Sequence, residues 1–205
     1  MGWRTSPLTI ALVVINIVLY GIDFLTGGAL ADRFELYPPA VQAGEWWRLL
    51  TYGFMHGSWP HVLINMYALL QAGIFVEYCY GTPRYSLIYL AGLIGGGVAA
   101  YLSTAGTSVP TVGASGAILG VFGAMGVLGL KLPRLRSALV RSAFFPIVLT
   151  LGYGLIVPGI SNWGHLGGVI AGGLMALLLN PVRGSELVLR TQSSPDDEET
   201  SEPER

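Results

Sequence analysis

A serine set among small residues is the first feature of the sequence that could do chemistry. Ser115 lies in the stretch GASG at 113–116, where an apolar segment begins. Its small neighbours would leave the hydroxyl uncovered and the backbone N–H accessible. A serine becomes a nucleophile only when a base lies within hydrogen-bond reach. The chain has three histidines, so one of them would have to be that base.

His165 is the candidate base, because its segment could pack tightly against the segment of Ser115. Both segments carry glycines at helical spacing, at 164, 168 and 172 in one and at 116, 120 and 123 in the other. Small residues at such spacing let two helix backbones approach closely. This approach would bring the serine oxygen within ~3 Å of an imidazole nitrogen, as general-base catalysis requires. No acidic residue is evident to orient His165, so the sequence predicts a dyad rather than a triad. The alternative is that the glycines serve helix packing alone.

His61 and Asn65 form a second candidate group. They lie four residues apart, so on a helix they share one face. Both side chains can donate hydrogen bonds. Donors aimed at a tetrahedral oxyanion are what acyl transfer needs. The alternative is a pair of buried polar groups that satisfy each other or the backbone.

The composition shows what kind of molecule must position these residues. Hydrophobic residues make up 52% of the 205 residues and charged residues only 11%, against about 25% charged residues in a soluble domain. This composition argues against a soluble globule of this size, a nucleic-acid binder and a disordered chain. The 29 glycines favour membrane helices that pack closely on one another. Cys79 is the single cysteine, so no intrachain disulfide can form.

Six apolar segments approach the ~20 residues that a membrane helix needs. They cover residues 8–25, 61–80, 85–103, 114–130, 139–157 and 163–179. The segment from about 30 to 59 is too polar to span, and its Tyr37, Trp46 and Trp47 suit the lipid–water boundary. The sequence thus predicts an all-α membrane protein, a bundle of six transmembrane helices whose first loop lies at the membrane interface.

The expected organisation is a membrane domain over 1–184 and an acidic, disordered cytoplasmic tail over 185–205. The tail is rich in acidic, Ser and Pro residues and holds few large apolar ones. The first apolar segment is about 18 residues long, more than a signal peptide usually has. We therefore expect a retained first helix, although Ala29-Leu30-Ala31 resembles a signal-peptidase site.

Basic residues predict the orientation in the membrane. With six spans both ends of the domain lie on one side. That side would hold Arg4, Arg84, Lys131, Arg134, Arg136, Arg141, Arg183 and Arg190, against Arg33 and Arg48 on the other. The excess makes the termini cytoplasmic. His61, Ser115 and His165 then lie at the starts of the second, fourth and sixth spans, at one depth on the opposite side. Three helix N-termini meet there, and their positive ends favour a developing oxyanion.

Five short segments between about 45 and 180 form an ordered set. They are WR at 47–48, HGSWPHVLIN at 56–65, Glu77 with Gly81, GASG at 113–116 and NWGHLGG at 162–168. With this set the chain resembles the rhomboid family of intramembrane serine proteases, in its minimal six-helix form. A lone GASG would be weak, whereas the ordered set on the expected helices is specific.

The resemblance implies roles for individual residues. Ser115 resembles the nucleophile and His165 the general base, while His61, Asn65 and the Ser115 N–H resemble the oxyanion site. Leu119 stands where some family members have a tyrosine stacked on the histidine. The residues that resemble structural supports are Trp47, Arg48, His56, Glu77, Gly113, Gly168 and Gly172.

The expected function is that of a serine endopeptidase acting in or near transmembrane helices of other membrane proteins. Its expected partners are transmembrane protein substrates and the lipid bilayer, with no nucleic acid. No cofactor or metal is expected, because the histidine spacing does not match HExxH or a comparable ligand cluster. A prokaryotic plasma membrane, with the active site opening to the outside, is the simplest location. The alternatives are a non-catalytic relative that escorts membrane clients and a small transporter, which would favour internal repeats.

Overall fold

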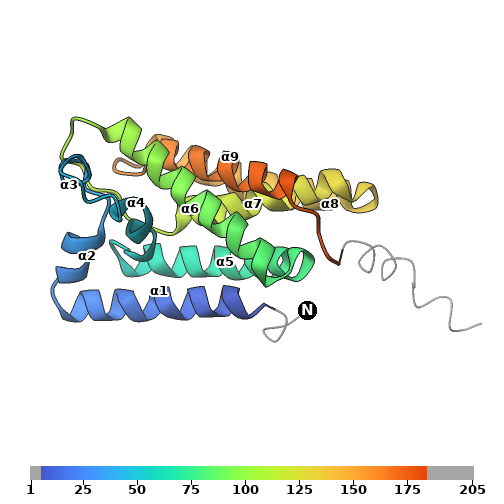
Figure 1. Cartoon of the computed structure of the whole chain (residues 1–205), viewed down its shortest axis with the longest axis horizontal. Helices are drawn as coiled ribbons and strands as arrows, with labels where there is room; N and C mark the ends of the chain where they lie inside the picture. The colour runs from blue at the N-terminus through green and yellow to red at the C-terminus, as the bar shows by residue number, and fades with distance from the viewer. Residues whose placement is uncertain (1–5, 184–205) are drawn as a thin grey trace, which may run out of the picture.

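The computed structural model describes residues 6–183 of the chain (Figure 1). Within this range the regular structure is helical, apart from one isolated antiparallel bridge between Leu36 and Thr111. The expected tail at 185–205 lies outside the described residues. The expected all-α fold is confirmed for the part that the structure describes.

Long helices occupy each of the six apolar segments. They are α1 (Pro7–Leu25), α5 (Trp59–Tyr80), α6 (Thr82–Thr104), α7 (Ser115–Lys131), α8 (Arg136–Ile156) and α9 (Asn162–Leu178). Four of the described helices, α1, α5, α6 and α8 with the turn before it, are long and apolar enough to cross a membrane. Because α7 and α9 have 17 residues each, the count of six spans stays a prediction.

Serine caps set where two of these helices begin. Ser58 accepts a hydrogen bond from the His61 N–H at the start of α5, and Ser161 accepts one from the Gly164 N–H at the start of α9. A serine at this position satisfies one of the free N–H groups of the first turn. The caps therefore place His61 and His165 in the first turns of their helices.

Helix α1 is attached to the bundle through a buried carboxylate. Glu77, in the last turn of α5, is fully buried. Its two oxygens accept from the N–H groups of Leu8 and Thr9, at 3.0 and 2.8 Å, and from the Thr9 and Thr82 hydroxyls, at 2.7 and 2.8 Å. An anion also interacts favourably with a helix N-terminus. Glu77 thus joins the start of α1 to the turn between α5 and α6.

Glycines bring three helix backbones together. A Cβ on Gly172 of α9 would lie 2.5 Å from the Gly120 Cα of α7, and one on Gly168 would collide with the Gly116 carbonyl. The same surface of α7 also meets α6, because a Cβ on Gly120 would lie 2.9 Å from the Gly92 Cα. The sequence indicated close approach of α7 and α9; the part played by α6 is an addition from the structure.

The segment between α1 and α5 is more ordered than the expected loop. It forms the short helices α2 (Ala29–Phe34), α3 (Pro38–Gln42), α4 (Arg48–Thr51) and η2 (Tyr52–Phe54). The buried Arg48 holds them together: it donates to the carbonyls of Asp32 and Glu35, at 3.1 and 2.9 Å, and to Glu45 Oε2 at 2.7 Å. In Figure 1 these short helices gather at one end of the bundle.

Candidate active site

The structure brings the predicted nucleophile and base together. Ser115 is the first residue of α7, and His165 is the fourth residue of α9. Ser115 Oγ lies 2.8 Å from His165 Nε2, which is hydrogen-bond distance. The backbone contact between Gly168 and Gly116 lies directly beside this pair and keeps the two helices close. This geometry is what a general base needs to take a hydroxyl proton.

The far side of the His165 ring meets no polar partner in the part of the chain that the structure describes. Nδ1 is buried and makes no hydrogen bond with any described residue. A third group that orients the imidazole is therefore absent from residues 6–183, and packing must hold the ring. Leu119, one turn beyond Ser115, is buried on α7.

Two further polar side chains lie against the backbone just before Ser115. Gly113 has a φ of +124°, and a Cβ there would lie 2.8 Å from Nε2 of His61 and 3.7 Å from Nδ2 of Asn65. A side chain would thus be strained in its backbone and would collide with His61. Asn65 Nδ2 is buried and has no acceptor among the described residues. An amide donor without a partner therefore lies next to the start of α7.

Backbone hydrogen bonds position the segment 111–113, which leads into Ser115. The Gly113 N–H donates to the Tyr52 carbonyl at 3.0 Å, and Thr111 exchanges two bonds with Leu36, at 2.9 and 3.0 Å. The Tyr52 hydroxyl in turn donates to the Leu93 carbonyl of α6 at 2.9 Å. Sequence reasoning missed Tyr52 and Leu36, since main-chain pairing leaves no residue signature at these positions.

The residues expected as structural supports lie in three different regions of the structure. Gly113, Gly168 and Gly172 lie at the backbone contacts around the Ser–His pair. Arg48 acts within the segment between α1 and α5, where the neighbouring Trp47 is 52% exposed, and Glu77 acts at the opposite end of the bundle. His56 packs its ring edge-on against His61, with centroids 5.0 Å apart. It supports His61 rather than Ser115.

His56 lies in the loop before α5 and is 3% exposed. Burial, and next the proximity of His61, lower its pKa from 6.5 to about 3. Its imidazole is therefore neutral at physiological pH.

Three helices direct their N-termini toward this site. The starts of α5, α7 and α9 lie at the end of the bundle that also holds α2 to α4 (Figure 1). The first N–H groups of a helix have no acceptor within the helix, and together they carry a partial positive charge. The arrangement can stabilise negative charge that develops beside Ser115.

The described chain is thus a bundle of apolar helices with a hydrogen-bonded Ser–His pair near one end. The family model described as the rhomboid domain matches residues 43–182 of the chain. The protein belongs to the rhomboid family and is an integral, multi-pass membrane protein.

Several curated relatives are similar over most of the chain. Rhomboid protease GluP of Bacillus subtilis is 38% identical over 140 residues, which cover 68% of this chain and 27% of that protein. RHOMBOID-like protein 9, chloroplastic, of Arabidopsis thaliana is 33% identical over 171 residues, 82% of this chain and 37% of the relative. Human Rhomboid-related protein 3 is 31% identical over 176 residues, 77% of this chain and 42% of the relative. The matched regions thus span between about a quarter and a half of these relatives.

Proposed function

We propose that this protein is an intramembrane serine endopeptidase that hydrolyses peptide bonds in or near transmembrane helices of other membrane proteins. The observation that carries the proposal is the 2.8 Å contact between Ser115 Oγ and His165 Nε2 in a bundle of apolar helices. The similarity to a relative named a rhomboid protease supports it. A non-catalytic role as a membrane escort would not require this contact.

The pair suffices for acyl transfer. Ser115 Oγ attacks the scissile carbonyl carbon while His165 Nε2 takes the hydroxyl proton. The tetrahedral intermediate collapses as His165 gives that proton to the leaving amine, and an acyl-enzyme remains. Water then attacks the ester, His165 again accepts a proton, and the acid product leaves with Ser115 restored.

The proposed oxyanion site uses three donors. The Ser115 N–H, in the first turn of α7, has no acceptor within its helix. Asn65 Nδ2 is a buried donor with no acceptor within residues 6–183, and the His61 ring lies against Gly113. Donors fixed in place before the reaction stabilise charge in the transition state more than mobile water does.

The expected substrate segment must unwind before it is cut. A transmembrane helix holds its carbonyls in internal hydrogen bonds, so the scissile carbonyl becomes accessible only where the helix opens. Small or helix-breaking residues near the end of the substrate helix should therefore favour cleavage. The proposed location is a prokaryotic plasma membrane, with the active site at its non-cytoplasmic side.

A fluorophosphonate probe, which reacts with activated serines, tests the proposal. Purified wild type should be labelled, while Ser115→Ala and His165→Ala should not. Ser108→Ala is the matched control, because Ser108 is an exposed residue of the loop before α7. Labelling of Ser115→Ala at the wild-type level would refute the assignment.

A further inference from the structure

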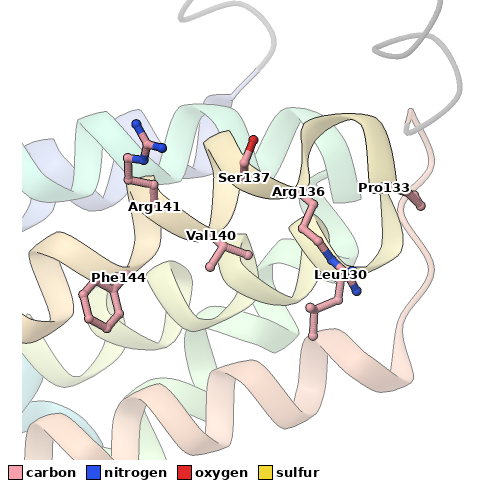
Figure 2. A pocket seen from close by; sticks show the side chains of 7 residues that line it. All are labelled: Leu130, Pro133, Arg136, Ser137, Val140, Arg141 and Phe144. Atoms are coloured by element: carbon pink, nitrogen blue, oxygen red, sulfur yellow. The ribbon is translucent and has the colours of Figure 1, made fainter.

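A shallow groove lies at the end of the bundle opposite the Ser–His pair, where α7 gives way to α8 (Figure 2). It is lined by Leu130 of α7 and by Arg136, Ser137, Val140, Arg141 and Phe144 of α8. We propose that this groove is a binding site for one anionic phospholipid from the leaflet at that end. The proposal does not depend on catalysis.

The apolar part of the groove faces outward from the bundle. Leu130 is 53% exposed and Phe144 55% exposed, and Val140 lies between them. Ser137, Val140, Arg141 and Phe144 follow the spacing of one helix face. Since α8 is the least buried of the four helices long enough to span, this face meets the surrounding lipid. An acyl chain can therefore lie along Val140 and Phe144.

The groove also contains two cations, Arg136 and Arg141. Arg136 and Arg141 make no ion pair or hydrogen bond with any residue from 6 to 183. Both arginines line the groove; in Figure 2 the Arg136 side chain extends toward Leu130, whereas Arg141 leaves α8 away from Leu130. Guanidinium groups bind phosphate through paired hydrogen bonds.

Among residues 6–183, Lys131 and Glu77 at the same end are engaged elsewhere and do not compensate this positive charge. Lys131 Nζ donates to the carbonyls of Ala176, Leu177 and Leu179, at 2.9, 3.0 and 2.5 Å, and so caps the end of α9. Glu77, a carboxylate at the same end, is fully buried and is held by four donors. Basic sites between membrane helices attract anionic head groups, and each arginine near the surface contributes to that attraction.

A phospholipid fits both halves of the groove at once. A soluble anion would neutralise the arginines and leave the apolar strip uncovered. A zwitterionic lipid such as phosphatidylcholine would cover the strip, but its own cationic group offsets its phosphate, so the net positive charge of the two arginines would stay uncompensated. An anionic lipid places its phosphate at the arginine-bearing part of the groove and its chain over Phe144.

Native mass spectrometry of the full chain in detergent tests the site by titration with phosphatidylglycerol or phosphatidylcholine. Wild type should bind phosphatidylglycerol at least about tenfold more tightly than phosphatidylcholine. Replacing Arg136 and Arg141 by glutamine should weaken it about fivefold per residue, the attraction expected of one basic residue near an anionic surface. Arg84→Gln is the control: Arg84 lies in the first turn of α6, outside the groove, so its replacement should leave lipid binding unchanged.

A second variant probes the apolar half. Phe144→Ser should weaken binding of both lipids, because it removes the surface that contacts the acyl chain. Equal affinity of wild type and the double arginine variant for phosphatidylglycerol would overturn the proposal, as would full displacement of the lipid by equimolar glycerol phosphate. If the chain's own acidic 185–205 segment occupied the groove, wild type and the double arginine variant would bind phosphatidylglycerol with equal affinity.

Discussion

Glu77 supplies hydrogen-bond acceptors to N–H groups in the first turn of α1, which have none within the helix. Replacing it by glutamine turns one acceptor oxygen into an amide that faces the N–H group of either Leu8 or Thr9, which donate to different oxygens of Glu77. Leaving a buried donor unsatisfied costs about 1–3 kcal/mol. We expect Glu77→Gln to lower the melting temperature in detergent by several degrees.

Glu45→Gln is the matched control. Glu45 pairs with Arg48 at 2.7 Å but is 37% exposed, and such a pair contributes little. A melting temperature that falls equally in both variants would show that the two carboxylates are energetically equivalent, contrary to the structure.

The buried His56 makes the protein sensitive to acid. Its pKa falls to about 3 on folding, so between about pH 6.5 and 3 the unfolded chain binds a proton that the folded chain does not. The folded state therefore loses stability as the pH falls through this window, by up to about 1.4 kcal/mol per pH unit.

We expect the melting temperature of His56→Gln to fall less steeply than that of wild type between pH 7 and 4.5. The comparison concerns slopes, because the substitution also changes packing against His61. Parallel slopes would mean that folding does not lower the pKa of His56.

Single residues of the site were predictable wherever the residue type itself carries the signal. Ser115 is recognisable by its small neighbours, and His61 with Asn65 by their spacing of four. The place of Tyr52 was not predictable, because its carbonyl accepts from Gly113 and any residue offers a carbonyl. The roles of these residues in catalysis remain predictions.

At the scale of helices, the distance between nucleophile and base depends on the contact of α7 with α9. A methyl group on Gly168 would collide with the Gly116 carbonyl, so α9 must move outward in Gly168→Ala. A displacement of about 1 Å in a catalytic site can lower the rate about 100-fold. We expect the rate of fluorophosphonate labelling of Ser115 to fall by about that factor.

Gly173→Ala provides the control on the same helix. A Cβ at Gly173 would meet its nearest neighbour, the Gly123 backbone, only at 3.9 Å, which is ordinary contact. Its labelling rate should equal that of wild type. Equal rates in both variants would show that the glycine contact does not set the Ser–His distance.

Long helices were predictable within a few residues, because apolar runs and prolines mark them. The helices α2 to α4 have four to six residues each, too few for an apolar period to be visible. The pairing of α6 with α7 was also hidden: Gly92 is one of many glycines, and only the packed structure shows that it faces Gly120.

For the whole molecule, the orientation in the membrane stays a prediction that cysteine labelling can test. Cys79 is buried and should not react with a membrane-impermeant maleimide. With intact cells, Ser108→Cys in the loop before α7 should be labelled, while Ser137→Cys at the start of α8 should be labelled only after lysis. The reverse pattern would invert the proposed topology.

The bridge between Leu36 and Thr111 has a mechanical consequence. Together with the hydrogen bond from the Gly113 N–H to the Tyr52 carbonyl, it connects the segment of short helices (α2, α3, α4 and η2) to the residues that lead directly into Ser115. Trp46 and Trp47 in this segment are exposed, as residues in contact with lipid head groups would be. A force that tilts the segment, such as a change in bilayer thickness, therefore reaches the nucleophile through three main-chain hydrogen bonds without first bending a helix of the bundle.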